Sequence, residues 1–314
     1  MANGIAFTSR NRPLPKFSDI MQSIQFAIIG GSGLYSMQGL QQTSELAIAT
    51  PYGATSDPIT VGLLDGVPVA FLARHGRSHA LLPTEIPFRA NIWALKSLGV
   101  KYLISVSAVG SFKESMAPRH MVLPDQFIDL TKHRAQSFFG DGVVAHVSLA
   151  QPVCSALSNL LAEAYDAVAG DAAFANSALH RGGTYVCIEG PQFSTLAESR
   201  MYRSWDASVI GMTNMPEARL AREAEIAYAT LALVTDFDCW HPGHAAVTAE
   251  MAIGNLLHNA SSAQQVLRAA VARLAASRPV SPAHTALAQA LVTQPDAMSA
   301  AARTRLAPLL ASYL

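Results

Sequence analysis

Two aspartates, Asp236 and Asp238, follow an apolar run directly in the sequence LALVTDFDCW. The run Ala229–Val234 predicts a buried strand. Because side chains two residues apart on a strand point to the same face, we expect both carboxylates to face one way and Phe237 the other. Two acids at the carboxyl end of a strand can bind a flat ring, one protonating a ring nitrogen and one accepting from an amine. They can equally be acids that cap a turn.

Small residues follow the first predicted strand, Phe26–Ile29. The GGSG sequence of residues 30–33 lets backbone N–H groups approach an anion closely. It does not match the dinucleotide fingerprint, because a G-x-G-x-x-G that starts at Gly31 requires glycine where Ser36 stands. It does not match a Walker loop either, since no Gly-Lys-Ser/Thr follows. The turn is therefore either an anion site or only a tight turn.

Basic and small groups follow two further strands. The second strand of a predicted hairpin, Val67–Leu72, leads to Arg74 and His75. The arginine offers a planar fork suited to phosphate and the histidine a second donor, although such clusters are also common on surface loops. Tyr102–Val106 leads to the sequence SAVGS. Because these strand ends lie along one edge of a doubly wound sheet, we expect a phosphate pocket beside an acid-lined ring pocket.

The composition indicates an oligomer that does not bind nucleic acid. The chain has 314 residues, enough to bury a sizeable core. Charged residues make up only 14% of it, against roughly 25% in an ordinary domain, which suggests that other copies of the chain cover part of its surface. Lys plus Arg and Asp plus Glu each total 22, so no general attraction to nucleic acid or anionic membranes is expected.

The cysteines and the N-terminus favour the cytoplasm. Cys154, Cys187 and Cys239 are scattered without metal-like spacing, which is typical of a reducing compartment. Basic residues near the N-terminus are not followed by the apolar segment of a secretory signal. No apolar run reaches the roughly 18 residues of a membrane helix.

The order of elements predicts an α/β fold, a single domain with a mixed central sheet flanked by helices. We expect a loose N-terminal arm at residues 1–21, the main domain at 22–278 and an extra C-terminal helical tail at 279–314. Further strands are expected at Met121–Leu130, Gly182–Ile188 and Ser208–Met212. Helices are expected at Thr84–Leu98, Pro152–Ala169, Thr195–Trp205, Glu217–Glu225 and from Thr248 to about Ala276.

Eight motifs occur in order along the chain: AIIGGSGLY, FLARHGRSHALLP, RANIWALKSLG, SAVGS, DQFID, IEGPQFSTLAES, GMTNMPEARLAREAE and TDFDCW. Over about residues 26–256 they resemble the 5′-methylthioadenosine phosphorylases of the trimeric purine nucleoside phosphorylase superfamily. One such match means little, but eight collinear matches are specific. The resemblance implies a nucleoside phosphorylase-like fold, a homotrimer, inorganic phosphate as a substrate, and neither cofactor nor metal.

The resemblance also implies residue roles. The phosphate contacts would come from Ser32, Arg74, His75, Ser107, Ala108 and Thr213. The nucleoside would be bound by Phe193 stacked on the purine, Asp236 and Asp238 at its edge, Met212 beneath the ribose, and Ser194 and Ala249, which tune substrate choice. His146 would reach the 5′ end of the nucleoside in a neighbouring subunit's pocket.

The implied reaction is phosphorolysis of 5′-methylthioadenosine to adenine and 5-methylthioribose-1-phosphate. Phosphate attacks C1′ through an oxocarbenium-like transition state while charge moves onto the purine. Asp236 is the candidate donor of a proton to N7. It can donate only if its pKa, about 3.9 in model peptides, is raised by desolvation and by the like charge of Asp238.

Two specificity expectations follow. An ionised Asp238 accepts from the amine of a 6-aminopurine but repels the oxygen of a 6-oxopurine, and relatives that use 6-oxopurines typically carry asparagine in place of Asp236 and glutamate in place of Ser194. At the 5′ end, Ala249 and Ile253 suit a methylthio group, whereas His146 can bond a hydroxyl. We therefore expect 5′-methylthioadenosine as the first substrate, with some activity on adenosine.

Other functions remain open from the sequence. The nearest is a phosphorylase for 6-oxopurine nucleosides or methylthioinosine; a different class is a non-catalytic nucleoside-binding module, which needs no proton donor. A dehydrogenase is disfavoured by the missing glycine at position 36. His241 and His244 can suggest a metal, but their spacing also fits a solvated loop. Cys239 lacks a triad-like partner in the sequence and fits a packed thiol.

Overall fold

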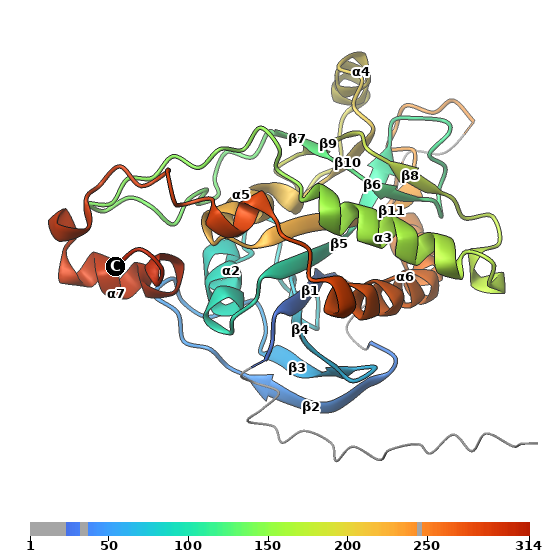
Figure 1. Cartoon of the computed structure of the whole chain (residues 1–314). Coiled ribbons are helices and arrows are strands. Elements are labelled where there is room, and N and C mark those ends of the chain that lie inside the picture. The colour runs from blue at the N-terminus through green and yellow to red at the C-terminus, as the bar shows by residue number, and fades with distance from the viewer. Residues whose placement is uncertain (1–22, 32–36, 244–246) are drawn as a thin grey trace, which may run out of the picture.

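An 11-stranded mixed sheet forms the centre of the molecule in a computed structural model that describes residues 23–31, 37–243 and 247–314 (Figure 1). Its strands are β1 (Phe26–Gly30), β2 (Leu40–Leu46), β3 (Ile59–Leu64), β4 (Val67–Ala73), β5 (Tyr102–Ser111), β6 (Met121–Leu123), β7 (Gln126–Asp129), β8 (Leu179–Arg181), β9 (Thr184–Cys187), β10 (Val209–Gly211) and β11 (Ala227–Asp236). The predicted arm at residues 1–21 and Ser32 lie outside the described residues.

Four parallel strands carry the groups that the sequence analysis singled out. β4 pairs with β1, β1 with β5, and β5 with β11, all in parallel. Their carboxyl ends therefore open on the same edge of the sheet, as expected for an α/β fold. β5 is long enough to pair with β10 as well, in antiparallel orientation beyond its parallel ladder with β1. This branching brings the loops after β9 and β10 to the same edge.

Helices cover the sheet on both faces (Figure 1). They are α2 (Phe88–Ser97), α3 (Ser155–Val168), α4 (Leu196–Ser204), α5 (Asn214–Glu223), α6 (Ala249–Ser277) and α7 (Ala300–Leu310). Apolar side chains of α3 and α6 share one hydrophobic cluster with the sheet, and those of α2, α5 and α7 share the other. The predicted α/β fold with a mixed sheet flanked by helices is confirmed. No helix formed by the described residues is long and apolar enough to cross a membrane.

Local sequence explains where several elements begin and turn. Asp65 and Gly66 both have positive φ, 50° and 84°, which is the backbone of a two-residue hairpin between β3 and β4. Thr195 and Glu198 form a capping box that starts α4. Thr248 caps α6 by accepting from the N–H of Met251.

Two expected elements differ from the structure, and two observed strands were not expected. The strand predicted at Met121–Leu130 is two strands, β6 and β7, because Pro124 lies between them and cannot donate to a ladder. The helix predicted from Thr84 begins four residues later, at Phe88. The strand β2 and the three-residue strand β8 were not predicted. β2 carries mostly polar residues and is exposed along much of one edge, so it lacks the apolar signal of a strand.

The C-terminal residues pack on the α2 side of the sheet. Leu306, Leu309 and Leu310 of α7 are buried in the same cluster as α2. Trp93 of α2 donates its indole N–H to the carbonyl oxygen of Arg305 at 3.0 Å. These contacts make residues 300–310 part of the hydrophobic core on this side.

Candidate active site

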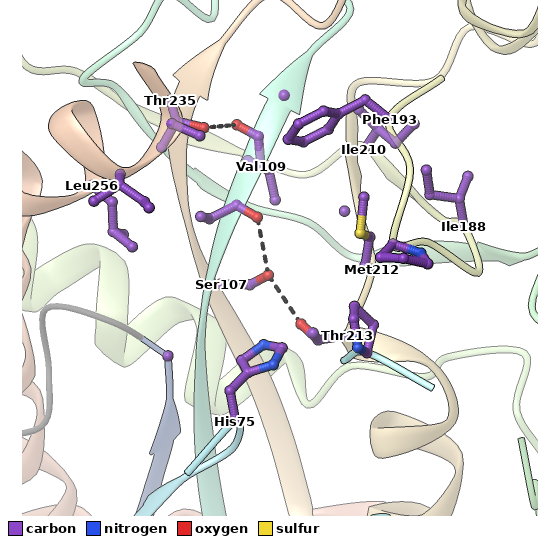
Figure 2. A pocket seen from close by; sticks show the side chains of 18 of the residues that line it. His75, Ser107, Val109, Ile188, Phe193, Ile210, Met212, Thr213, Thr235 and Leu256 are labelled. Atoms are coloured by element: carbon purple, nitrogen blue, oxygen red, sulfur yellow. Dashed lines mark hydrogen bonds between the residues drawn. The ribbon is translucent and has the colours of Figure 1, made fainter. Parts of the chain in front are cut away.

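A cavity of about 350 Å³ opens at the carboxyl edge of the parallel strands. It is lined by residues that follow β1, β4 and β9, by the ends of β10 and β11 and the residues after them, by the last half of β5, and by one turn of α6. Its volume is within the range of sites for small organic ligands. Hydroxyl and imidazole groups gather at one end, and Phe193 lies towards the other (Figure 2).

Two hydroxyl groups and a histidine form the polar end (Figure 2). The Oγ of Ser107 lies 3.3 Å from the Oγ1 of Thr213, so the two side chains are joined by a hydrogen bond across β5 and the start of α5. His75 and Ala108 also line this part of the cavity. Four of the residues expected to contact phosphate therefore lie together.

His75 is held in one tautomer. Its Nδ1 lies 2.8 Å from the carbonyl oxygen of Leu81, which can only accept, so Nδ1 carries the proton of the neutral ring. Burial, with the nearby Arg74 charge adding to it, lowers the pKa of His75 to about 4, so the ring is neutral near pH 7. The Nε2 then accepts, and the expected role as a second donor is wrong for this state. A hydrogen phosphate ion, which keeps one P–OH, can donate to it.

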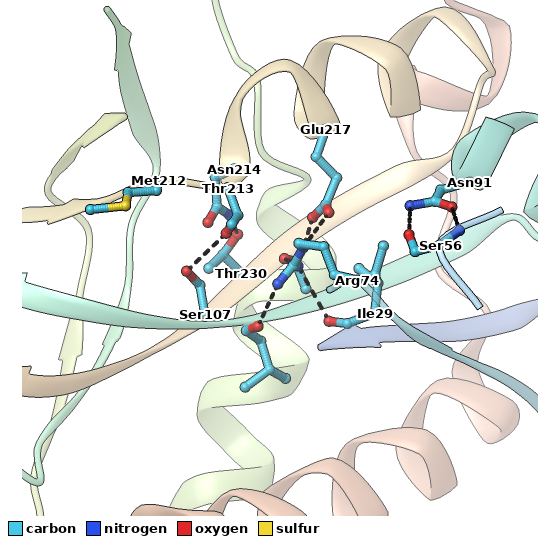
Figure 3. A network of polar contacts seen from close by, with 12 residues as sticks. Ile29, Ser56, Arg74, Asn91, Ser107, Met212, Thr213, Asn214, Glu217 and Thr230 are labelled. Carbon is cyan, nitrogen blue, oxygen red and sulfur yellow. Dashed lines mark hydrogen bonds and ion pairs between the residues drawn. The ribbon is translucent and has the colours of Figure 1, made fainter. Parts of the chain in front are cut away.

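Arg74 is buried beneath this end and paired with Glu217, which lies 143 residues further along the chain (Figure 3). Its Nε and Nη2 donate to the two carboxylate oxygens at 2.7 and 3.1 Å. Nη1 donates to the carbonyl of Val106, and Nη2 also donates to the Oγ of Ser105 at 2.6 Å. The bidentate face of the guanidinium thus binds Glu217 and not the cavity. Among the described residues, the second N–H of Nη1 has no hydrogen-bond acceptor.

The electrostatics explain this arrangement. Burial alone would lower the pKa of Arg74, but the Glu217 carboxylate beside it raises the pKa above the ordinary value. A buried guanidinium without a counter-charge would be strongly destabilising. Glu217 was missed from the sequence, because nothing local to α5 marks it as the partner of a strand-end arginine. Arg74 lines the cavity, but its Nε and Nη2 groups donate to Glu217 and not to a ligand in the cavity.

Asp236 and Asp238 both line the opposite part of the cavity, and both are buried. Oδ1 of Asp236 accepts from the backbone N–H of Asp238 at 2.8 Å, and Oδ2 lies 2.7 Å from the Oγ1 of Thr235. Burial raises the pKa of Asp236, and these two hydrogen bonds offset only part of the rise. The expected direction of the pKa shift is confirmed. The expected help from the charge of Asp238 is not: that repulsion raises the pKa of Asp238 instead, after burial.

The Thr235 hydroxyl can serve either protonation state of Asp236. Its Oγ1 lies 2.7 Å from Oδ2 of Asp236 and 3.2 Å from the carbonyl oxygen of Val109 (Figure 2). When Asp236 is ionised, the hydroxyl donates to Oδ2. When Asp236 is protonated, the hydroxyl accepts from Oδ2–H and donates to Val109. A neutral carboxyl group can therefore be held here without an unpaired proton.

The two carboxylates meet through a turn and not through strand alternation. β11 ends at Asp236, after a register shift between Val234 and Asp236, and Asp238 has the left-handed φ of 52°. Both acids do face the cavity, as expected, but the expected reason, alternation along one strand, is wrong because the strand ends at Asp236. Both acids reach the cavity because the chain enters a turn at Asp238, directly after Phe237, whose ring packs against Trp240.

Phe193, Ser194 and Met212 complete the set that the structure brings together, since all three line the cavity. Phe193 is 44% exposed, so one face of its ring is open. The Oγ of Ser194 is buried and has no hydrogen-bond partner among the described residues. A buried unpaired hydroxyl beside an open aromatic ring is the arrangement of a site that a polar, flat ligand would complete.

Two expected site residues do not line this cavity. Ala249 is exposed at the first turn of α6, whereas Ala252 and Leu256, further along the same helix, do line it. His146 is exposed on the loop after β7, and its backbone N–H donates to the carbonyl of Ala290. Ala249 lies three residues before Ala252, on the same side of α6, but one turn before the part of the helix that lines the cavity.

Arg134 is a further residue that the sequence did not single out. Its guanidinium is buried and donates to the carbonyl oxygens of Met212 and Met215 at 2.7 and 2.6 Å, and to that of Glu189 at 2.7 Å. It also pairs with the Glu189 carboxylate. It thereby joins the loop after β9 to the loop after β10, and both of these loops line the cavity.

Comparisons with known proteins agree on one family. A model of the phosphorylase superfamily matches residues 25–272. The chain is 59% identical over 290 residues to the S-methyl-5′-thioadenosine phosphorylase of Thermosynechococcus vestitus, covering 92% of this chain and 99% of the relative. The protein of the same name from Gloeobacter violaceus is 55% identical, with 92% and 96% covered.

Solved structures give the same result. A methylthioadenosine phosphorylase from an Antarctic soil metagenomic library superposes with a TM-score of 0.87 at 60% identity, covering 92% of this chain and 99% of that one. An adenosine/methylthioadenosine phosphorylase mutant of Schistosoma mansoni, bound to methylthioadenosine, has a TM-score of 0.76 at 32% identity, with 81% and 92% covered.

Proposed function

The chain belongs to the phosphorylase superfamily and, within it, to the S-methyl-5′-thioadenosine phosphorylases, and we propose that it cleaves 5′-methylthioadenosine with inorganic phosphate. The products are adenine and 5-methylthioribose-1-phosphate, which makes the enzyme a pentosyltransferase. The observation that carries this proposal is that one cavity holds two buried acids at one part and the Ser107–Thr213 hydroxyl pair at another.

The proposed reaction is an in-line displacement at C1′ of the ribose. A phosphate oxygen forms a bond to C1′ while the C1′–N9 bond breaks and its electron pair moves onto the purine. The proton of Asp236 turns from the Thr235 hydroxyl to N7 and is transferred, and the resulting carboxylate accepts from the Thr235 hydroxyl and the Asp238 N–H. The burial of Asp236, which raises its pKa, favours return of a proton from solvent before the next cycle.

The phosphate is proposed to lie against Ser107, Thr213, the backbone of Ala108 and the Nε2 of His75, with the remaining Nη1 N–H of Arg74 behind it. Hydroxyl and backbone donors suit an anion that offers mainly acceptors, and holding it close to C1′ supplies the proximity that dominates such reactions. Phosphate as the nucleophile and a carboxyl group as the proton donor need no cofactor. Ser32 keeps its proposed role as a phosphate contact.

The base is proposed to stack on Phe193, with Asp236 at N7 and Asp238 accepting from the 6-amine. The unpaired hydroxyl of Ser194 faces the same region. A 6-oxopurine would place its oxygen against the Asp238 carboxylate, and an unsatisfied buried polar group costs about 1–3 kcal/mol. Methylthioinosine should therefore be cleaved roughly 10–100-fold less efficiently than methylthioadenosine. Comparable kcat/KM values for the two would favour the 6-oxopurine alternative.

The 5′ substituent is proposed to face the apolar wall that α6 provides opposite Met212, where Leu256 lies (Figure 2). Ala252 and Ile253 line the same wall. This wall favours a methylthio group over a hydroxyl, so adenosine is proposed as a slower substrate. The ratio of kcat/KM for the two nucleosides tests the order, and a strong preference for adenosine would reverse it.

We also propose a cytoplasmic homotrimer in which His146 of one copy covers the 5′ end of a neighbour's site. Apolar side chains around the cavity support a covering partner: Leu82, Leu196, Ile253 and Leu257 are between 44% and 58% exposed. Light scattering after size exclusion measures the subunit number. A fully active monomer would contradict the proposal.

The experiment that tests the function is the release of free adenine from methylthioadenosine with and without phosphate. The proposed enzyme releases adenine only with phosphate and forms one sugar phosphate for each adenine. Binding of the nucleoside without any release would identify a nucleoside-binding module instead. Release without phosphate would identify a hydrolase.

A further inference from the structure

A buried tyrosine lies directly behind the Ser107–Thr213 hydroxyl pair of the cavity. Tyr185, on β9, is fully buried, and its phenol oxygen lies 3.2 Å from the Oγ of Ser107. Ser107 in turn lies 3.3 Å from the Oγ1 of Thr213. Tyr185 does not itself line the cavity. The phenol therefore touches the hydroxyl pair from the protein side, not from the ligand side.

Glycine at position 211 makes room for this phenol. A Cβ atom on Gly211 would lie 2.0 Å from the phenol oxygen of Tyr185 and 2.6 Å from its Cζ, far below contact distance. Gly211 lines the cavity, next to Met212. The tyrosine head thus occupies the space in which any other residue at position 211 would place its side chain.

We infer that Tyr185 is a positioning residue of the phosphate site, which directs the proton of Ser107 towards the bound phosphate. A serine hydroxyl has one proton and can accept as well as donate. If Tyr185 donates to Ser107, one lone pair of Ser107 is used from behind and its proton remains for an acceptor on the other side, either the carbonyl oxygen of Ala108 at 3.3 Å or a phosphate oxygen in the cavity. Phosphate oxygens mainly accept, so both Ser107 and Thr213 must donate to hold the anion.

The phenol is suited to a permanent donor role. Burial is the main cause that raises the pKa of Tyr185 above its ordinary value, so the group keeps its proton throughout the working pH range. In the alternative direction, Ser107 donates to Tyr185, and a lone pair of the Ser107 oxygen would then face the phosphate anion. This inference rests on the proposed function, because it assigns a role towards phosphate in the same site.

The variant Tyr185→Phe tests it, since it removes one oxygen and keeps the ring. We expect the KM for phosphate to rise by about fivefold, as for the loss of one neutral hydrogen bond, with the KM for methylthioadenosine changed by less than about twofold. The matched control is Tyr165→Phe. Tyr165 is also buried and donates to a serine hydroxyl, that of Ser177 at 3.4 Å, but it lies on α3 outside the cavity.

A phosphate KM in Tyr185→Phe equal to that of the control overturns the inference, as does an equal rise for both substrates. If the wild type releases adenine with phosphate while this variant is unaffected, only the positioning role fails and the proposed function stands. If the wild type shows no phosphate-dependent release, the function itself fails.

A double-mutant cycle tests the role of Gly211 independently. In Gly211→Ala the phenol must move, so its contact to Ser107 is already lost. We therefore expect Tyr185→Phe to change the phosphate KM by less than about twofold in the Gly211→Ala background. Additive effects of the two substitutions would show that Gly211 and Tyr185 act separately and would overturn the coupling. Should Gly211→Ala fail to fold, the single Tyr185→Phe result decides.

Discussion

The backbone N–H of Asp238 donates to Oδ1 of Asp236 at 2.8 Å, and this bond orients the buried carboxyl group at the cavity. The bond favours the ionised state of Asp236, whereas burial favours the neutral state, and burial is the larger effect. The side chain is therefore held between two protonation states. That is the condition a general acid needs if it is to give up a proton and regain it near the working pH.

The first prediction concerns the pH dependence of turnover. Because the pKa of Asp236 is raised and the neutral form donates, kcat should fall as pH rises through that pKa. Thr235→Val removes a hydrogen bond that lowers the pKa, so the alkaline limb of the kcat profile should move to higher pH. The measurement is the kcat–pH profile of both proteins. A limb that stays in place, or moves to lower pH, would separate Thr235 from the ionisation of the acid.

The second prediction concerns base selectivity. An amide at position 236 has two N–H groups and can donate to both N7 and the oxygen of a 6-oxopurine, whereas the single proton of the neutral Asp236 serves N7 alone. Asp236→Asn should therefore lower the kcat/KM ratio of methylthioadenosine to methylthioinosine by about tenfold, the amount of one lost repulsive or unpaired contact. Steady-state kinetics on both nucleosides provide the ratio. An unchanged ratio would place the 6-position away from these acids.

The third prediction concerns stability in acid. The pKa of His75 is about 4 in the folded chain and about 6.5 when exposed, so the unfolded state binds the extra proton between these values. Stability therefore falls as pH drops from 6.5 towards 4. Between pH 7 and pH 5 the wild type should lose roughly 2 kcal/mol more unfolding free energy than His75→Gln, which does not titrate. Urea unfolding at the two pH values measures the difference, and parallel losses would refute it.

The fourth prediction concerns the pair beneath the phosphate end. Glu217→Gln leaves the buried Arg74 charge without a counter-charge, and such a loss typically costs about 3–5 kcal/mol of unfolding free energy. The control is Asp166→Asn, which breaks the exposed pair with Arg181 and should cost less than about 1 kcal/mol. Denaturant unfolding compares the two variants. Equally small losses of unfolding free energy in both variants would mean that groups other than Glu217 stabilise the Arg74 charge.

The sequence predicted what depends on local pattern. Apolar runs placed most central strands, and the strand-end residues Arg74, His75, Ser107, Asp236 and Asp238 were expected at one edge and do line one cavity. The helix expected from Thr248 does begin there, and the Thr248 side chain caps it. These features depend on strand periodicity and backbone capping, which a short stretch of sequence determines.

What the sequence did not predict depends on contacts between distant segments. Glu217 becomes the partner of Arg74 only when α5 folds over β4 and β5, and Tyr185 reaches Ser107 only because β9 and β10 lie beside the end of β5. The positive φ of Asp238 is likewise set by the turn that packs Phe237. No periodicity records such contacts. The requirement for glycine at position 211 can be recognised only once the Tyr185 phenol is known to lie beside it.

The central claim is that Asp236 supplies the proton that lets adenine leave. The direct measurement is kcat for phosphorolysis of methylthioadenosine by Asp236→Ala, at saturating phosphate and with folding checked by thermal unfolding. A general acid contributes about 10²–10⁴-fold, so kcat should fall by that factor. A folded variant that turns over within a few-fold of the wild type would contradict the claim.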